Sequence, residues 1–166
     1  MGVIEQYDSE HKRAFYAEVM GDGTDNIHFG KWDGVDTEAP GAYGKAATGM
    51  TNWMWKQAMD IIDKPGTKSI KYIDLGSGSG SAAAHLCQRD PRVEAMCINL
   101  CPNQNQENMD RAKSLGLGKR CYPCNRSSLS FLPAVVSNGL DLLEAARGSA
   151  AGGLRSIVDF LLHGVV

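Results

Sequence analysis

The chain has 166 residues, a net charge of -2 and 43% hydrophobic residues, which are the values of an ordinary globular domain. Its near-neutral charge gives no general attraction to nucleic acid or to an acidic membrane, and no apolar run reaches the roughly 20 residues of a membrane span. Five cysteines without an apolar leader at the N-terminus predict reduced thiols in a soluble, cytoplasmic protein.

The N-terminal third predicts two helices separated by a loop. Apolar residues at helical spacing over Ser9–Met20 predict an amphipathic helix that Gly21 ends. Residues 21–49 are rich in Gly, Asp and Thr, and we expect them to form mostly loop. A second helix is predicted over Thr51–Ile62, before the turn Lys64-Pro65-Gly66.

The middle of the chain alternates between strand and helix patterns. Buried strands are predicted over Ser69–Leu75 and Val93–Leu100, and helices over Ser81–Cys87 and Gln104–Leu115. This order predicts parallel strands joined by right-handed crossovers.

Glycines alternate in the turn after the first strand, Asp74-Leu75-Gly76-Ser77-Gly78-Ser79-Gly80. Such a turn lets the backbone approach a flat, charged small molecule closely, because glycine has no Cβ and adopts positive φ. The dinucleotide fingerprint needs a third glycine where Ser81 stands, and the chain lacks the Gly-Lys-Ser/Thr of a phosphate loop. The turn is therefore either another kind of small-molecule site or a Gly/Ser-rich loop without a ligand.

The pattern Asp74-x-Gly76-x-Gly78-x-Gly80 resembles the first motif of class I S-adenosylmethionine-dependent methyltransferases. The resemblance implies an α/β fold with a Rossmann-like methyltransferase sheet, incomplete here, and S-adenosylmethionine as the cofactor. It also implies that the acidic strand end and the turn hold the methionyl and ribose parts of that cofactor. The implied residues are Asp74, Gly76, Ser77, Gly78 and Gly80.

The end of the second strand resembles an Ile/Leu-Asn-Leu segment of small-amine N-methyltransferases, the group that includes the sarcosine and dimethylglycine enzymes. Asn99 stands where most class I enzymes have Asp or Glu to hold the ribose hydroxyls. An amide can still donate to and accept from two hydroxyls, without the charge of a carboxylate. The resemblance implies cofactor contacts from Asn99, Leu100 and Gln104, and the alternative for Asn99 is a turn residue at a strand end.

Three N-terminal segments are similar to the same group: Tyr7-Asp8-Ser9-Glu10, Phe15-Tyr16 and Asn26-Ile27-His28-Phe29-Gly30. The implied reaction transfers a methyl group to a small amine, and positive charge moves from sulfur to nitrogen. Aromatic rings can face a methylated ammonium, so the substrate-side candidates are Tyr7, Tyr16 and Trp32, with His28 as a polar anchor or base. For each of them, packing is the alternative role.

The chain departs from the family pattern after Lys119. Residues 111–140 contain no Asp or Glu, so the acidic residue that holds the adenine in the family has no counterpart. Cys121-Tyr122-Pro123-Cys124 has the spacing of a redox pair or half a zinc site, but without a second Cys/His pair we interpret it as accidental and expect no metal. A helix is predicted over residues 154–166, where it could cover a sheet edge or mediate self-association.

These patterns predict a helical N-terminal cap over residues 1–66, half of a methyltransferase domain over 67–119, and an atypical tail over 120–166. The predicted function is methylation of a small amine of the sarcosine or dimethylglycine type, as in glycine betaine synthesis. The alternatives are methylation of phosphoethanolamine, a sterol or a tocopherol-like lipid, and a non-catalytic remnant that binds a cofactor or a partner. No residue is assigned as the catalytic base.

We expect the purified chain to methylate a small amine weakly or not at all, because the adenine-binding acid and the later strands of the family have no counterpart. Transfer of a labelled methyl group from S-adenosylmethionine to sarcosine or dimethylglycine measures this. Robust turnover at saturating cofactor would contradict the expectation.

Overall fold

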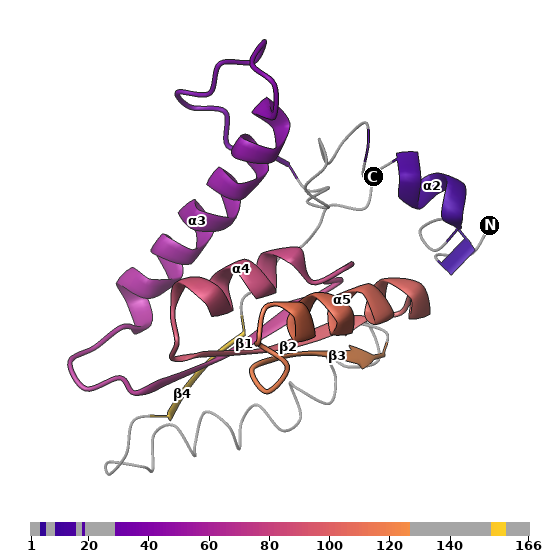
Figure 1. Ribbon diagram of the computed structural model, residues 1–166. Helices are drawn as coiled ribbons and strands as arrows, with labels where there is room; N and C mark the ends of the chain where they lie inside the picture. The colour runs from indigo at the N-terminus through magenta and orange to yellow at the C-terminus, as the bar shows by residue number, and fades with distance from the viewer. Residues whose placement is uncertain (1–3, 6–8, 16–17, 19–28, 127–153, 159–166) are drawn as a thin grey trace. The chain divides into compact units, whose positions relative to one another are not determined.

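The computed structural model describes residues 4–5, 9–15, 18, 29–126 and 154–158. The chain forms two compact units, one of residues 1–61 with 163–166 and one of residues 62–162. Helices α2 (Glu10–Phe15) and α3 (Ala42–Ile62) belong to the first unit, apart from the last residue of α3, and the sheet belongs to the second (Figure 1).

The second unit is built on a parallel sheet with the strand order β3-β2-β1-β4. Helices α4 and α5 join β1 to β2 and β2 to β3, and both lie along the same face of the sheet (Figure 1). The predicted parallel sheet with crossover helices is confirmed, and the strand order is the beginning of the one typical of doubly wound sheets. The bounds are β1 Ser69–Leu75, α4 Ser81–Arg89, β2 Val93–Asn99, α5 Pro102–Ser114, β3 Cys121–Asn125 and β4 Leu154–Val158.

The core of this unit lies between the sheet and its two helices. In the register of the sheet, Tyr72 lies opposite Ala95 and Asp74 opposite Cys97, and all four residues are buried. The side chains that fill the remaining space are mostly small, so the helices can lie close to the strands. They include Ala83, Ala84, Cys87, Ala95, Cys97 and Cys121, each at most 2% exposed.

The opposite face of the sheet is partly buried and carries a polar cluster on β1, β2 and β3. Lys71 of β1 forms an ion pair with Glu94, its register partner on β2. The hydroxyl of Tyr122 on β3 donates a hydrogen bond to the same carboxylate, at 3.4 Å. Because strand side chains alternate between faces, these residues project away from the side that the helices cover.

Strand β3 contains Cys121-Tyr122-Pro123-Cys124, so the chain continues the sheet shortly after Lys119. The Sγ atoms of Cys121 and Cys97 lie 4.0 Å apart. Residues three apart on a strand project from opposite faces, so Cys121 and Cys124 do not have the geometry of a redox pair. Within the described residues, no group of three or more His, Cys, Asp or Glu side chains could hold a metal ion.

Helix α3 begins at Ala42, whereas the sequence predicted loop as far as Gly49. Its first half is rich in small residues because another segment lies against it: Lys31 N donates to the carbonyl of Ala46 at 2.8 Å. A Cβ on Gly30 would come within 2.6 Å of the Ala46 Cβ, so glycine permits a close approach there. The predicted first helix is confirmed over Glu10–Phe15, and much of the rest of it lies outside the described residues.

The helix predicted over residues 154–166 is wrong for its first five residues, which form strand β4. This strand runs parallel to β1, and Ile157 lies opposite Tyr72. A short apolar run fits a buried strand as well as a helix, and the sequence pattern did not separate the two. Residues 159–166 lie outside the described part, so self-association through a helix there stays a prediction.

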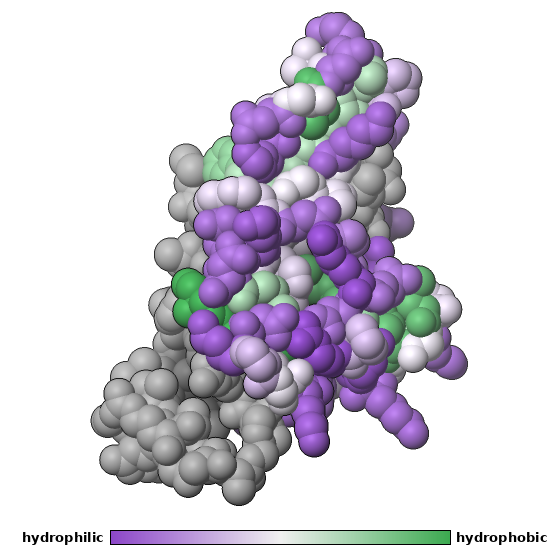
Figure 2. All heavy atoms as spheres, turned by 90° about the vertical axis from the view of Figure 1, so that its left-hand side faces the viewer, coloured by the Kyte–Doolittle hydropathy of each residue, from purple (hydrophilic) through white to green (hydrophobic). Residues whose placement is uncertain are grey.

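Hydrophilic side chains predominate on the face drawn in Figure 2, and the hydrophobic ones form small separate areas. The large apolar residues with the most exposed surface are Phe29 and Ile61, each 72% exposed. Of the helices that the structure describes, none combines the length and the apolar character that crossing a membrane requires.

We predict that the free energy of unfolding falls as the pH rises from 9 to 10. Hydrogen bonding to Cys121 and burial raise the pKa of Cys87. A hydrogen bond with Cys87 lowers the pKa of Cys121, but a hydrogen bond with Cys97 and burial outweigh it and raise that pKa to about 12, from an ordinary 9.0. Both thiols stay protonated in the folded state while the unfolded chain ionises, so stability is complete below about pH 9 and is lost above it.

The measurement is urea denaturation at several pH values under reducing conditions. The loss should not exceed about 1.4 kcal/mol per pH unit for each thiol. Cys121→Ala should flatten the pH dependence, because it removes one thiol with a raised pKa and a hydrogen-bond partner of the other. An equally steep dependence in Cys121→Ala would refute the assignment.

Candidate functional site

The glycine loop, residues 76–80, follows β1 at the carboxyl end of the sheet. Strand β1 lies between β2 and β4, so the strand order reverses at β1. In open α/β sheets, ligands bind outside the carboxyl ends of the strands at such a reversal. The loop therefore stands where a doubly wound sheet places its ligand.

The loop has a left-handed backbone at alternate positions. Gly76, Gly78 and Gly80 have φ values of +75°, +55° and +72°, which confirms that this turn uses positive φ. Residues with a Cβ adopt this conformation only at a cost of roughly 1–2 kcal/mol each. Gly76 N and Ser77 N both donate to the carbonyl of Ile98 on β2, at 2.8 and 3.2 Å, so the start of the loop is fixed to the neighbouring strand.

One side of the loop is open. A Cβ added to Gly76 or Gly78 would meet no atom within 4 Å. Beside these glycines, Ser77 Oγ is buried and has no hydrogen-bond partner among the described residues. An accessible backbone next to a buried hydroxyl that lacks a partner fits a polar ligand lying across the loop, as S-adenosylmethionine would.

Asp74, the last residue but one of β1, and Asn99, the last residue of β2, lie on the face that the helices cover. Asp74 is 1% exposed and Asn99 is 9% exposed. Asn99 Nδ2 donates to the carbonyl of Gly78 at 3.3 Å and to Oε1 of Gln104 at 2.9 Å. Asn99 therefore ties the glycine loop to α5, which is more than a turn residue at a strand end would do.

The structure thus brings together the predicted cofactor residues at the ends of β1 and β2. Leu100 directly follows β2, and Gln104 stands in the first turn of α5. Which atoms of a cofactor each residue contacts stays a prediction.

Two residues of α5 at this site were missed from the sequence. Arg111 donates from Nε to the carbonyl of Ser79 and from Nη2 to its Oγ, both at 3.3 Å. Asn108 is fully buried, and a Cβ added to Gly80 would collide with its amide group. A usable signal existed in the spacing of Gln104, Asn108 and Arg111, which places all three on one stripe of a helix.

Of the substrate-side candidates, only Trp32 is described; Tyr7, Tyr16 and His28 lie outside the described residues. Trp32 is 42% exposed, and its ring meets that of Tyr43 edge-on, with 6.0 Å between centroids. Burial raises the pKa of the Tyr43 hydroxyl. Sequence reasoning did not select Tyr43, which lies in the part of α3 that was predicted to be loop.

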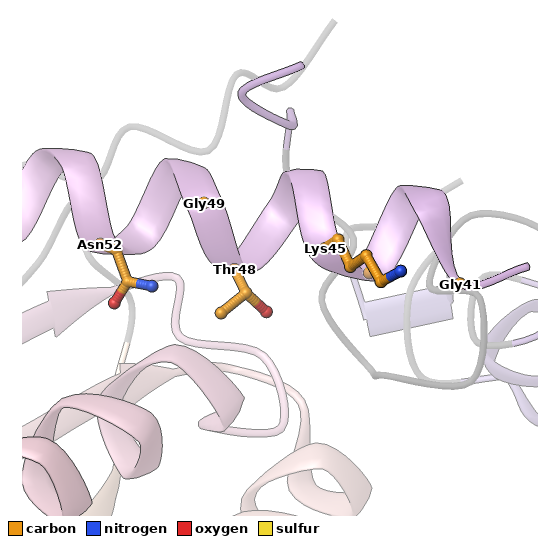
Figure 3. Close-up of a pocket in the computed structure, with 6 residues that line it drawn as sticks. Gly41, Lys45, Thr48, Gly49 and Asn52 are labelled. Carbon is orange, nitrogen blue, oxygen red and sulfur yellow. The ribbon is translucent and has the colours of Figure 1, made fainter. Parts of the chain in front are cut away.

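A groove of about 440 Å³ lies along the first half of α3. Figure 3 shows Lys45, Thr48 and Asn52 projecting from the same side of this helix. Glycines complete the lining, and no carboxylate, thiol or imidazole is among the described residues that line the groove, so it lacks the usual metal ligands. The lining residues are Gly41, Gly44, Lys45, Thr48, Gly49 and Asn52.

The chain resembles solved structures of methyltransferases. A candidate sarcosine dimethylglycine methyltransferase from Galdieria sulphuraria is 26% identical over 71% of this chain and 41% of its own, with a TM-score of 0.53. A geranyl diphosphate methyltransferase in complex with GPP and sinefungin is 18% identical over 74% of this chain and 47% of its own, with a TM-score of 0.55. The geranyl diphosphate C-methyltransferase from Streptomyces coelicolor, solved with S-adenosyl-L-homocysteine, has a TM-score of 0.51 at 16% identity, over 75% of this chain and 46% of its own.

No family model matches the sequence, and no curated protein matches it significantly. The structural matches show that the chain has the Rossmann-like fold of S-adenosylmethionine-dependent methyltransferases. The chain spans 41% to 47% of the length of the three structures above.

Gly80→Ala should destabilise the chain more than Gly78→Ala. Both substitutions force alanine into a positive-φ conformation, at about 1–2 kcal/mol. Only the Cβ at position 80 also collides with Asn108. Urea denaturation of both variants measures the difference.

The collision can be tested separately in the double variant Gly80→Ala/Asn108→Ala. It should lose less stability than the sum of its two single variants, because each substitution relieves a cost of the other. Equal losses for the two glycine variants, with additive behaviour in the double variant, would show that Asn108 does not restrict position 80.

Proposed function

We propose that this chain is the cofactor-binding part of an S-adenosylmethionine-dependent methyltransferase that methylates a small amine of the sarcosine or dimethylglycine type. The observation that carries the proposal is the glycine loop: it has three positive-φ glycines, follows β1 at the reversal of strand order, and is open above Gly76 and Gly78. The methyltransferase fold supports the same class of cofactor.

The residues around the loop would hold different parts of the cofactor. The backbone of Gly76 and Gly78 can lie against it without steric conflict, and Ser77 Oγ can hydrogen-bond to it. Asn99 directs Nδ2 toward protein acceptors, so Oδ1 is the atom that would accept a bond from a ribose hydroxyl. The buried Asp74 carboxylate would attract the α-ammonium group of the methionyl end.

When bound, S-adenosylmethionine supplies an activated methyl group on a sulfonium. The chain contributes mainly by positioning, since an in-line displacement depends on the alignment of donor and acceptor. A negative field near the reacting nitrogen favours the charge that develops there, and Asp74 is a source of such a field.

The small-amine acceptor is supported by two independent features. The candidate sarcosine dimethylglycine methyltransferase from Galdieria sulphuraria is 26% identical to this chain. The aromatic rings of Trp32 and Tyr43 are steeply inclined to each other, with an interplanar angle of 71°. Such a corner can hold a methylated ammonium through cation–π attraction.

Calorimetric titration of the full chain with S-adenosylmethionine and S-adenosylhomocysteine tests the proposal. We expect saturable binding of both, and weaker binding in Gly78→Ala, whose Cβ enters the space that the cofactor would occupy. Gly66→Ala is the matched control, because Gly66 also has positive φ (+90°) and a Cβ there also meets no atom within 4 Å. Gly66 precedes β1, at the opposite end of that strand from the loop.

Two outcomes would count against the proposal. Absence of saturable heat with the wild-type chain would indicate a non-catalytic remnant. The chain could also bind the cofactor but methylate phosphoethanolamine or a lipid, and not sarcosine or dimethylglycine. This result would replace the acceptor and keep the cofactor.

A further inference from the structure

We propose that helix α5 holds the glycine loop in its ligand-binding conformation and that Arg111 is the main positioning residue. The inference rests on the proposed function, because it concerns the same loop and the same cofactor. Three successive loop residues, Gly78, Ser79 and Gly80, each meet a side chain that α5 directs or supplies.

Arg111 makes the one charged contact among these and holds Ser79 through two atoms. Its Nε donates to the carbonyl of Ser79 and its Nη2 to the hydroxyl, so the planar guanidinium holds one residue through two hydrogen bonds. Ser79 is 9% exposed and lies between two glycines with positive φ. A bidentate contact at this place fixes the peptide that connects the two left-handed residues.

The other two contacts act on either side of Ser79. Gln104 accepts from Asn99, whose amide group also donates to the carbonyl of Gly78. Asn108 fills the space above Gly80 and accepts a weak bond from Cys121 Sγ, at 3.8 Å. Because the three α5 residues stand at positions i, i+4 and i+7, one stripe of the helix acts on three consecutive loop residues, and on Gly78 through Asn99.

A loop with three glycines needs such support. Glycine has more backbone freedom to lose than any other residue, so an unsupported loop of this composition populates many conformations. Any ligand would then have to order the loop when it binds, at a cost in affinity. Contacts that order the loop beforehand remove this cost without touching the ligand.

Arg120 offers a matched control. Its Nη1 donates to the carbonyls of Cys87 and Val93, at 2.9 and 3.0 Å, so it also links separate elements by a guanidinium. These acceptors lie at the end of α4 and the start of β2, away from the glycine loop. Loss of Arg120 should therefore lower stability without acting on the loop.

The first experiment measures amide hydrogen exchange in the free full-length chain. Arg111→Ala should accelerate exchange of the Gly80 amide, which donates to the carbonyl of Ser77 at 2.9 Å in the folded loop. Arg120→Ala should change the exchange rate of this amide only as far as it lowers the free energy of global unfolding. Unchanged protection in Arg111→Ala would overturn the proposal, whether or not the chain binds a cofactor.

The second experiment measures the dissociation constant for S-adenosylhomocysteine. Arg111→Ala should weaken binding by about tenfold, since it removes two charge-assisted bonds. Arg111→Lys should recover part of the affinity, because an ammonium keeps the charge but lacks the planar fork. Arg120→Ala should bind like the wild type at temperatures where both are folded.

A double-mutant cycle with Ser79→Ala identifies the route. If Arg111 acts through Ser79, the double variant should bind less weakly than the sum of the two single effects predicts. Additive effects, or equal losses in the Arg111 and Arg120 variants, would overturn the positioning role. Failure of the wild type itself to bind would instead refute the cofactor assignment and leave hydrogen exchange to decide on the loop.

Discussion

The site depends on how the end of β1 is fixed to β2. Two successive amides, those of Gly76 and Ser77, donate to the single carbonyl of Ile98. Because both bonds are made by the backbone, they require no particular side chain, but they do require the chain to turn at once into positive φ. Everything else at this edge of the sheet follows from that turn. The open side of the loop, the buried Ser77 hydroxyl and the reach of Asn99 to Gly78 all exist because the backbone bends there.

Much of this arrangement could be predicted from the sequence. The alternation of apolar residues gave β1 its bounds to the residue, and the small-residue helix after the loop was predicted two residues too short. The conformation of the loop was also predictable, because alternate glycines have few other uses directly after a buried strand. Strand and turn signals of this kind are local, and local signals are what a sequence states most directly.

What could not be predicted depends on contacts between distant segments. Helix α3 starts early because its small residues pack against the segment around Gly30, whereas the same glycines in isolation indicate loop. Residues 154–158 form strand β4 because they pair with β1. Arg111 has a part in the site because the carbonyl of Ser79, more than 30 residues earlier in the chain, accepts its hydrogen bond. Pairing of this kind has no signature within a window of a few residues.

The buried amides of α5 also decide how that helix can sit. Asn105 donates to the carbonyl of Asn99 at 3.2 Å, and Asn108 accepts from a cysteine on β3. A helix that buried only leucine or valine could roll or slide by part of a turn and still satisfy its neighbours. Here such a movement would break the hydrogen bonds of buried amides, at a cost of about 1–3 kcal/mol for each lost partner. The buried polar groups therefore favour the observed rotation of α5 about its own axis, in return for some lost hydrophobic contact.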